Sequence, residues 1–221
     1  MTIICLSGRA RCGKDTFANV LINKYGFNRV SFADPLRNIC ARVFYLDPDM
    51  FVADDKKDAP MRRIHVDFHD IDAIRTIVEN EWGYTIDEED RACMEEYHGR
   101  ELDTPRDVLR FVGNMLRDYV DENIWINLAM AKVKECKGRI VITDARFENE
   151  RVLFRKLGAL LVLIKRGEHV AQEHEFNLGT EDEYDVVFDN STTLHAYQSS
   201  VDTWYSTRKN ELELYKVWKY E

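Results

Sequence analysis

The stretch with the clearest chemistry runs Leu6-Ser7-Gly8-Arg9-Ala10-Arg11-Cys12-Gly13-Lys14-Asp15-Thr16 near the amino terminus. An apolar run precedes it and predicts a buried strand, and a helical pattern follows it. From Gly8 to Lys14 the spacing is that of a phosphate-binding loop, in which backbone N–H groups converge on an anion and the Lys adds a positive charge. The amino end of the next helix attracts the same anion.

The two residues that follow this lysine, Asp15 and Thr16, are candidate ligands of a metal ion. In the strict motif a Ser or Thr directly follows the Lys and reaches Mg²⁺, whereas here Asp15 takes that position and Thr16 comes next. The order resembles the Gly-Lys-x-Thr form of nucleoside monophosphate kinases. Asp15 has two interpretations that stay open: it binds Mg²⁺ or orients an attacking hydroxyl, or it is a helix-terminal acid favoured by the dipole.

A second acidic candidate ends an apolar run. Residues 139–143 predict a buried strand that leads to Asp144, the form of the strand whose terminal Asp helps hold Mg²⁺ opposite a phosphate loop. Arg146 and Glu150 follow, four residues apart at the start of a predicted helix. They could pair with each other, or both could face the cleft beside Asp144.

A third group of candidates lies on a predicted helix that starts near Thr104-Pro105. Its non-apolar positions are Arg106, Arg110, Gly113, Asn114 and Arg117. Three arginines on one helix are either solvated surface or a phosphate grip, because a guanidinium binds phosphate oxygens bidentately. Trp125, in the next predicted helix, is a core residue or a ligand contact.

The remaining pattern predicts an α/β protein. Strands are expected at residues 29–33, 159–165 and 184–190, and helices at 16–24, 36–45 and 194–218. The turn at Ser31 to Pro35, which includes Asp34, would follow a strand, and ligands bind at the carboxyl ends of parallel strands.

We expect a single domain over residues 1–221, because no repeat or linker divides it. Residues 47–100 are charge-dense with weak periodicity, which predicts an inserted subdomain on the substrate side. Residues 166–183 are the candidate for a mobile lid.

Composition restricts the classes of partner. The net charge of −9 argues against a general nucleic-acid binder, and no apolar run is long enough to span a bilayer. Five cysteines that form no even disulfide framework and lack zinc spacing indicate a cytoplasmic protein with reduced thiols. Cys12 lies inside the phosphate loop and is expected to be sensitive to thiol reagents, although nothing nearby marks it as a nucleophile.

Taken in order, these motifs resemble the deoxynucleoside monophosphate kinases of tailed bacteriophages over most of the chain. The matching stretches are Leu6 to Thr16, Ser31-Phe32-Ala33-Asp34-Pro35-Leu36, Thr104 through Trp125, and Thr143-Asp144-Ala145-Arg146-Phe147 to Glu150. The resemblance implies a P-loop fold of three α/β/α layers with a mainly parallel sheet, a helical insertion and a lid. It also implies phosphoryl transfer from ATP, with Mg²⁺, to a deoxynucleoside monophosphate for phage DNA synthesis in the host cytoplasm.

The resemblance also assigns roles to the site residues. Gly8, Arg11, Gly13, Lys14 and Thr16 would bind ATP. Asp15, Thr16 and Asp144 would hold the metal, and Lys14, Asp15, Arg106, Arg110, Asp144 and Arg146 would act in catalysis. The acceptor would be bound by Ser31, Asp34, Arg106, Arg110, Gly113, Asn114, Arg117, Trp125 and Glu150. Arg110 stands where relatives often have Gln, and Asn114 where they often have Thr, so the accepted base stays open.

Two alternatives also remain open. The first is a P-loop kinase of another small acceptor, of the phosphomevalonate or dephospho-coenzyme A kinase type, because a fold does not fix an acceptor. The second is a nucleotide-binding module without catalysis, against which the arginine-bearing helix argues. The sequence leaves the choice between monomer and homodimer open.

Overall fold

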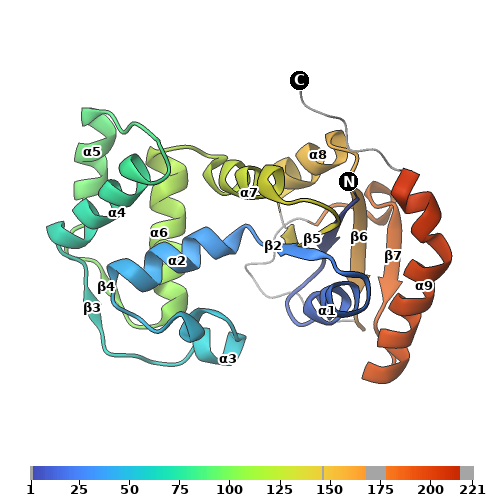
Figure 1. The fold of residues 1–221 in the computed structure, drawn as a ribbon. Helices are drawn as coiled ribbons and strands as arrows, with labels where there is room; N and C mark the ends of the chain where they lie inside the picture. Colours follow the sequence, from blue (N-terminus) through green and yellow to red (C-terminus); the bar gives the residue numbers. More distant parts are fainter. Residues whose placement is uncertain (1, 146, 168–177, 215–221) are drawn as a thin grey trace. The chain divides into compact units, whose positions relative to one another are not determined.

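The computed structural model describes residues 2–145, 147–167 and 178–214, and the chain divides into two compact units (Figure 1). Unit 1 combines the segments Met1–Phe32 and Ala129–Glu221, and unit 2 is the intervening segment Ala33–Leu128. The segment 47–100 therefore lies within unit 2, together with the arginine-bearing helix. None of the helices in the described ranges is long and apolar enough to cross a membrane.

Unit 1 is built on a five-stranded sheet in the order β2-β5-β1-β6-β7, with every neighbouring pair parallel. The strands are β1 (Ile3–Ser7), β2 (Asn28–Val30), β5 (Ile140–Ala145), β6 (Leu160–Lys165) and β7 (Val186–Asp189). Its helices are α1 (Lys14–Tyr25), α8 (Glu148–Lys156) and α9 (Leu194–Leu214), with the short helix η2 (Glu181–Glu183). The predicted α/β class with a mainly parallel sheet is confirmed, and it is consistent with a P-loop kinase.

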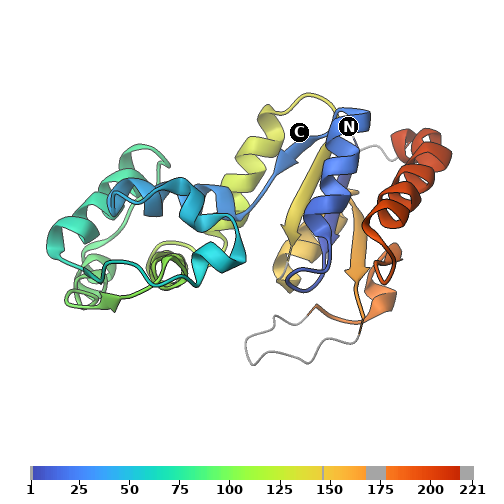
Figure 2. The ribbon, with the colours of Figure 1, turned by 90° about the horizontal axis from the view of Figure 1, so that it is seen from below.

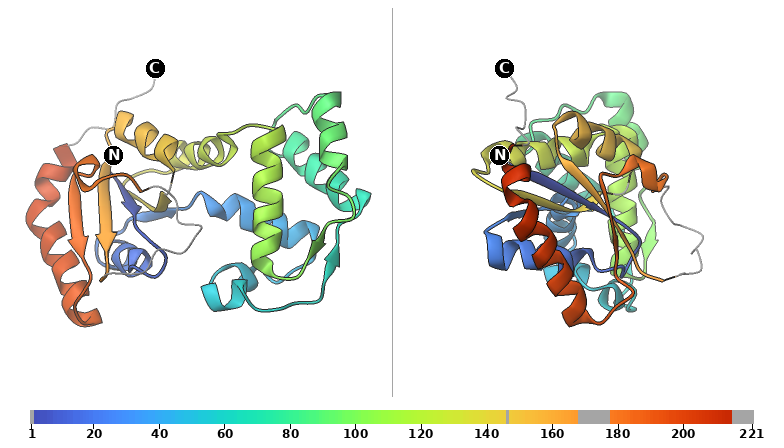
Figure 3. Two further views of the ribbon diagram at one scale, coloured as in Figure 1. Left: turned by 180° about the vertical axis from the view of Figure 1, so that it is seen from behind. Right: turned by 90° about the vertical axis from the view of Figure 1, so that its right-hand side faces the viewer.

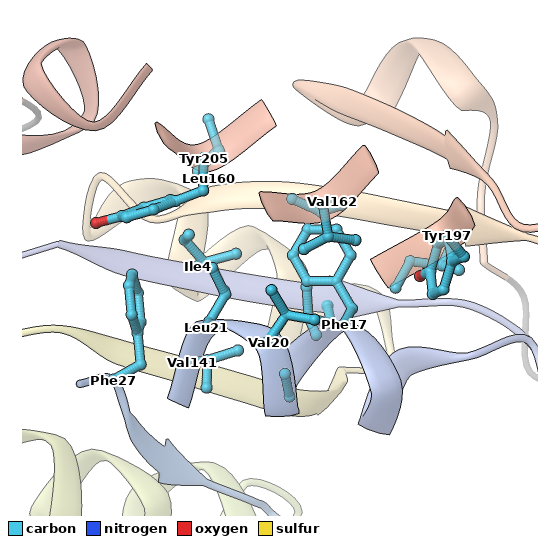
Figure 4. Packing of buried hydrophobic residues seen from close by; sticks show 14 of the residues in the cluster. Ile4, Phe17, Val20, Leu21, Phe27, Val141, Leu160, Val162, Tyr197 and Tyr205 are labelled. Carbon is cyan, nitrogen blue, oxygen red and sulfur yellow. The ribbon is translucent and has the colours of Figure 1, made fainter. Parts of the chain in front are cut away.

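Side chains alternate between the two faces of this sheet. Those on one face, among them Ile4, Val141 and Val162, share a buried cluster with α1 and α9, which lie next to each other (Figure 2). Phe17 of α1 and Tyr197 and Tyr205 of α9 are almost fully buried in it (Figure 4). Burial of a large apolar side chain stabilises a fold by roughly 2 kcal/mol. This cluster therefore fixes α1, and with it the preceding loop, against the sheet.

Unit 2 is mostly helical and packs around α6 (Pro105–Tyr119), which contacts α2, α3 and α5 (Figure 3). Its other helices are α2 (Ala33–Val43), η1 (Pro48–Phe51), α3 (Asp54–Lys57), α4 (Phe68–Asn80) and α5 (Glu88–Glu95), and β3 (Ile64–His65) pairs antiparallel with β4 (Glu101–Leu102). Helix α7 (Ile124–Glu135) begins in unit 2 and ends in unit 1.

The sequence of α6 explains why it forms. Thr104 accepts a hydrogen bond from the Asp107 N–H, the Asp107 carboxylate accepts one from the Thr104 N–H, and Pro105 occupies the first turn, where no N–H donor is needed. Its apolar side is buried, and Arg106, Arg110, Asn114 and Arg117 follow one another on its polar side at three- and four-residue spacing. The predicted helix is confirmed.

Two predicted elements are present with other bounds. The strand expected at residues 29–33 ends at Val30, and the helix expected at 36–45 begins at Ala33. Asp34 and Pro35 therefore lie in the first turn of α2 rather than in a turn that closes a strand. This is stable because the first turn of a helix leaves its N–H groups unpaired, so a proline costs nothing there, and an acid is favoured by the dipole.

Candidate active site

The loop from Gly8 to Lys14 joins β1 to α1 and has a backbone that glycine makes feasible. Gly8 and Gly13 have φ of 147° and 108°. A Cβ on Gly8 would lie 2.5 Å from the Ile164 carbonyl oxygen, and one on Gly13 would lie 2.3 Å from Nδ2 of Asn190. Arg11 is also left-handed, at φ 60°, a conformation that costs a non-glycine residue about 1–2 kcal/mol. The loop is thus held in one conformation by its surroundings.

Lys14 folds back over this loop. Its Nζ donates to the carbonyl oxygens of Gly8 at 2.7 Å and Arg9 at 2.6 Å. The lysine cation is therefore held beside the loop's backbone N–H groups, at the amino end of α1. A fixed ammonium group, a helix terminus and glycine-rich backbone in one place form a site for an anion such as a phosphate chain.

Cys12, within the loop, does not have the properties of a reactive thiol. Its side chain is buried, and burial raises the pKa of the thiol, although the nearby Lys14 ammonium opposes the shift. A thiol needs both access and thiolate character to react. The structure therefore argues against the expected sensitivity of Cys12 to thiol reagents.

A cavity of about 270 Å³ lies against the loop. Arg11 and residues 13–16 line one side of it, and Arg166, Asn190, Thr192 and Leu194 line the other. The sequence analysis did not name these last four as site residues. Arg166 directly follows β6, and the other three follow β7, so the rule that parallel strands present ligand-binding residues at their carboxyl ends could have found them.

Asp144 is held firmly at the end of β5. Its Oδ2 accepts a hydrogen bond from the Ser31 hydroxyl at 2.7 Å, and its Oδ1 accepts one from the Phe32 N–H at 3.0 Å. Ser31 is itself buried. The structure therefore brings together two predicted site residues that are 113 positions apart in the chain.

The Asp15 side chain, unlike that of Asp144, is exposed to solvent. It is 82% exposed, and its Oδ1 lies 3.9 Å from a guanidinium nitrogen of Arg29. Arg29 also donates from Nε to the Thr143 hydroxyl at 3.3 Å, which places a cation near the first turn of α1. The sequence analysis missed Arg29, because nothing local distinguishes it from a surface arginine.

Glu150 and Arg146 have different outcomes. The Glu150 side chain is buried, and its Oε2 accepts a hydrogen bond from the Phe147 N–H at 3.0 Å, so it caps the start of α8. Arg146 lies outside the described residues, as do positions 168–177 of the expected lid.

The acceptor candidates other than Ser31 and Glu150 lie in unit 2. Arg106 binds Asp58 bidentately, with Nε donating to Oδ1 and Nη2 donating to Oδ2 at 3.0 Å. Arg106, and more weakly Arg110, hold the pKa of the Asp58 carboxyl below its usual value. Arg110 and Asn114 are exposed. Arg106, which is predicted to bind the acceptor phosphate, is therefore already paired with the Asp58 carboxylate in this structure.

Three further acceptor candidates have packing roles in unit 2. A Cβ on Gly113 would come within 3.4 Å of the Leu36 side chain, so this glycine lets α6 approach α2. Trp125 packs edge-on against Trp82, with 6.0 Å between ring centroids. Asp34 accepts a hydrogen bond from Arg37 at 3.1 Å.

The predicted site residues therefore fall into two sets. Unit 1 carries Gly8, Arg11, Gly13, Lys14, Asp15, Thr16, Ser31, Asp144 and Glu150, and unit 2 carries Asp34, Arg106, Arg110, Gly113, Asn114, Arg117 and Trp125. Within the described residues, no group of three or more His, Cys, Asp or Glu side chains could hold a metal by itself.

Together these features define the class of protein: an α/β fold with an anion site between a glycine loop and the ends of parallel strands. The chain is similar to a protein of Acanthamoeba polyphaga mimivirus named "Putative deoxynucleotide monophosphate kinase", with 28% identity over 91% of this chain and 94% of the relative. This similarity confirms the resemblance to deoxynucleoside monophosphate kinases that the motifs indicated, and the link to tailed bacteriophages stays a prediction.

Two other comparisons add little. No protein-family model matches the chain. A crystal structure of a sugar kinase from Janibacter sp. HTCC2649 aligns over 93% of this chain and 95% of its own, with a TM-score of 0.39 and 12% identity. That similarity is too low to establish a shared fold.

Proposed function

We propose that this protein is an ATP-dependent kinase that transfers the γ-phosphoryl group to a deoxynucleoside 5′-monophosphate and produces the diphosphate and ADP. One observation carries the proposal. Lys14 is held over a glycine loop beside a cavity at the carboxyl end of a parallel sheet, in a chain similar along its length to a protein named as such a kinase.

The donor would bind at the loop and cavity of unit 1. Backbone N–H groups from Gly8 to Lys14 would contact the phosphates, Lys14 would neutralise their charge, and Arg11 and Thr16 would complete the contacts. Leu194 is exposed at the cavity and would give apolar contact to a base.

Magnesium fits the groups present. Mg²⁺ commonly binds through one or two carboxylates and substrate phosphates rather than through a cage of side chains, and Asp144 is a fixed carboxylate in this unit. Asp144 and Thr16 would hold the ion, with Asp15 as the second carboxylate. When bound, it would neutralise charge on the transferring phosphate.

The acceptor would bind to the polar side of α6. Arg106 and Arg110 would contact its phosphate bidentately, and Arg117 would add charge, because guanidinium groups match phosphate geometry. Asn114, Asp34, Gly113 and Trp125, all in the same unit, would contribute to contacts with the nucleoside.

The chain's residues would act by alignment and charge neutralisation. The attacking oxygen of a monophosphate is already anionic, so no general base is needed. Arg106, Arg110 and Arg146 would balance charge that spreads between the two phosphates. Water must be excluded to prevent ATP hydrolysis. In a virus-infected cell the product would supply DNA synthesis.

The test is magnesium-dependent ADP production from ATP with dAMP, dGMP, dCMP, dTMP and the four ribonucleotides as acceptors. We expect at least one deoxynucleotide to stimulate turnover, and Lys14→Ala to abolish it. Lys24→Ala is the matched control, because Lys24 lies on the same helix but pairs with Asp202 at the surface. If ATP binds but no monophosphate stimulates turnover, the acceptor assignment is wrong and a kinase of another acceptor or a binding module replaces it.

A further inference from the structure

Asn190 reaches the loop from the far end of the chain. It directly follows β7, its side chain is only 6% exposed, and its Nδ2 donates to the Cys12 carbonyl at 2.9 Å. Its own backbone N–H donates to the Lys165 carbonyl at 2.7 Å, which ties it to the end of β6. The amide is therefore anchored by the sheet, and it contacts the loop backbone from a fixed position.

Tyr197 makes a parallel contact one residue further along the loop. It lies in the first turns of α9 with 1% of its surface exposed, and its hydroxyl donates to the Gly13 carbonyl at 3.4 Å. The tyrosine ring and the Asn190 amide together occupy the space around Gly13 where a Cβ would project. Two side chains after β7 thus contact two successive carbonyl groups of the loop, and the Gly13 carbonyl also accepts the first hydrogen bond of α1, from the Phe17 N–H at 3.0 Å.

The fixed carbonyls determine where the following N–H groups point. In a planar trans peptide the C=O of one residue and the N–H of the next point in opposite directions. The bonds from Asn190 and Tyr197 therefore direct the N–H groups of Gly13 and Lys14 away from β7 and α9. Gly13 is left-handed, and in left-handed or right-handed helical backbone successive N–H groups point the same way. Two such N–H groups on one side form an anion-binding concavity.

We infer that Asn190 and Tyr197 are positioning residues, which hold the Cys12 and Gly13 carbonyls so that the next two N–H groups face the phosphate chain of a bound nucleoside triphosphate. This rests on the donor site of the proposed function and not on its acceptor. Neither side chain need touch the phosphates: each acts through the loop backbone.

The test measures phosphate binding directly. In Asn190→Leu, which keeps the size but removes the amide, we expect the Kd for both ATP and inorganic pyrophosphate to rise about fivefold, because the net value of a hydrogen bond is near 1 kcal/mol. In Tyr197→Phe, which removes one oxygen, we expect a rise of about twofold to threefold. By NMR, the pyrophosphate-induced shifts of the Gly13 and Lys14 amide protons should shrink in both variants.

Tyr205→Phe is the matched control, since Tyr205 is equally buried on α9 but packs against Tyr25 and Phe27 instead of the loop. Its Kd for pyrophosphate should be that of the native protein. The inference is overturned if either folded variant keeps native affinity and native amide shifts, or if affinity falls only in proportion to unfolded protein. Should Asn190→Leu not fold, Tyr197→Phe decides. Pyrophosphate binding does not depend on any acceptor, so this test stands even if the kinase assay shows no turnover.

Discussion

In unit 1 the candidate phosphate contacts come mainly from backbone, whereas in unit 2 they come from side chains on an exposed face of one helix. Gly8 and Gly13 adopt conformations that a Cβ would obstruct, and other parts of the sheet touch them closely. Arg106 and Arg110 project from α6, whose apolar side packs in the interior of unit 2. The proposed donor contacts thus depend on the backbone conformation of unit 1, and the proposed acceptor contacts depend on exposed side chains of unit 2.

The difference has a consequence for how each half tolerates change. A substitution in the loop changes the chain's path, because the backbone itself is the binding group. A substitution on the polar side of α6 changes which groups meet the acceptor while the buried side keeps its packing. We therefore expect that substitutions on the polar side of α6 change which acceptor is preferred and leave donor binding unchanged. Arg110 and Asn114 are the positions where we expect this change in preference.

The largest expected effect is at Gly13. Gly13→Ala would place a Cβ against the Asn190 amide in backbone at φ 108°, so the loop must leave its conformation. We expect the affinity for ATP to fall about 100-fold or more, since several N–H contacts are lost together. Isothermal titration calorimetry with ATP and Mg²⁺ measures it.

Gly26→Ala is the control for this change. Gly26 ends α1 at φ 68°, and a Cβ there would meet nothing within 4 Å. It should lower the free energy of unfolding by about 1 kcal/mol and leave the Kd for ATP unchanged. Equal losses of ATP affinity in both variants would mean that the close contact at Gly13 has no special role.

The loop was predictable from sequence because its requirements are local. Glycines at Gly8 and Gly13 followed by a lysine, between an apolar strand and a helix, specify the conformation of the loop and predict an anionic ligand. The residues that support the loop were not predictable in the same way. Asn190 lies 178 positions from Cys12, and its amide resembles that of any asparagine in a turn until the strand order places it beside the loop.

The acceptor half shows the opposite limit. The period of α6 predicted the helix and the side on which its arginines lie, but not what each contacts, because exposed side chains leave no pattern in sequence. Arg106 binds Asp58, which comes from a charge-dense stretch that gave only weak signals. Arg29 was missed for the same reason.

A second prediction separates the two candidate metal carboxylates of unit 1. Asp144 is fixed by Ser31 and Phe32, whereas Asp15 is exposed, and a rigid ligand loses less freedom on binding an ion. Asp144→Asn should raise the Mg²⁺ concentration for half-maximal turnover about tenfold, and Asp15→Asn should raise it much less. A magnesium titration at saturating ATP measures both, and a larger effect at Asp15 would reverse the assignment.

The smallest expected effect concerns the Asp58 carboxylate, which an acceptor phosphate must displace from Arg106. In Asp58→Asn the arginine loses its charged partner, and we expect the KM for the monophosphate to fall about twofold to fivefold, the range that an exposed ion pair is worth, with kcat little changed.

Arg106 lowers the pKa of the Asp58 carboxyl, so the carboxyl is ionised at every pH above the ordinary pKa of an aspartate. The difference in KM between the native protein and Asp58→Asn should therefore stay the same around neutral pH. Glu81→Gln is the matched control: it breaks the bidentate pair with Arg42, which joins α2 to the end of α4 in the same unit and involves no residue of α6. Its KM should be native. An unchanged KM in Asp58→Asn would mean that the acceptor phosphate does not bind to Arg106. The side-chain contacts that we assign to unit 2 would then have to come from other residues.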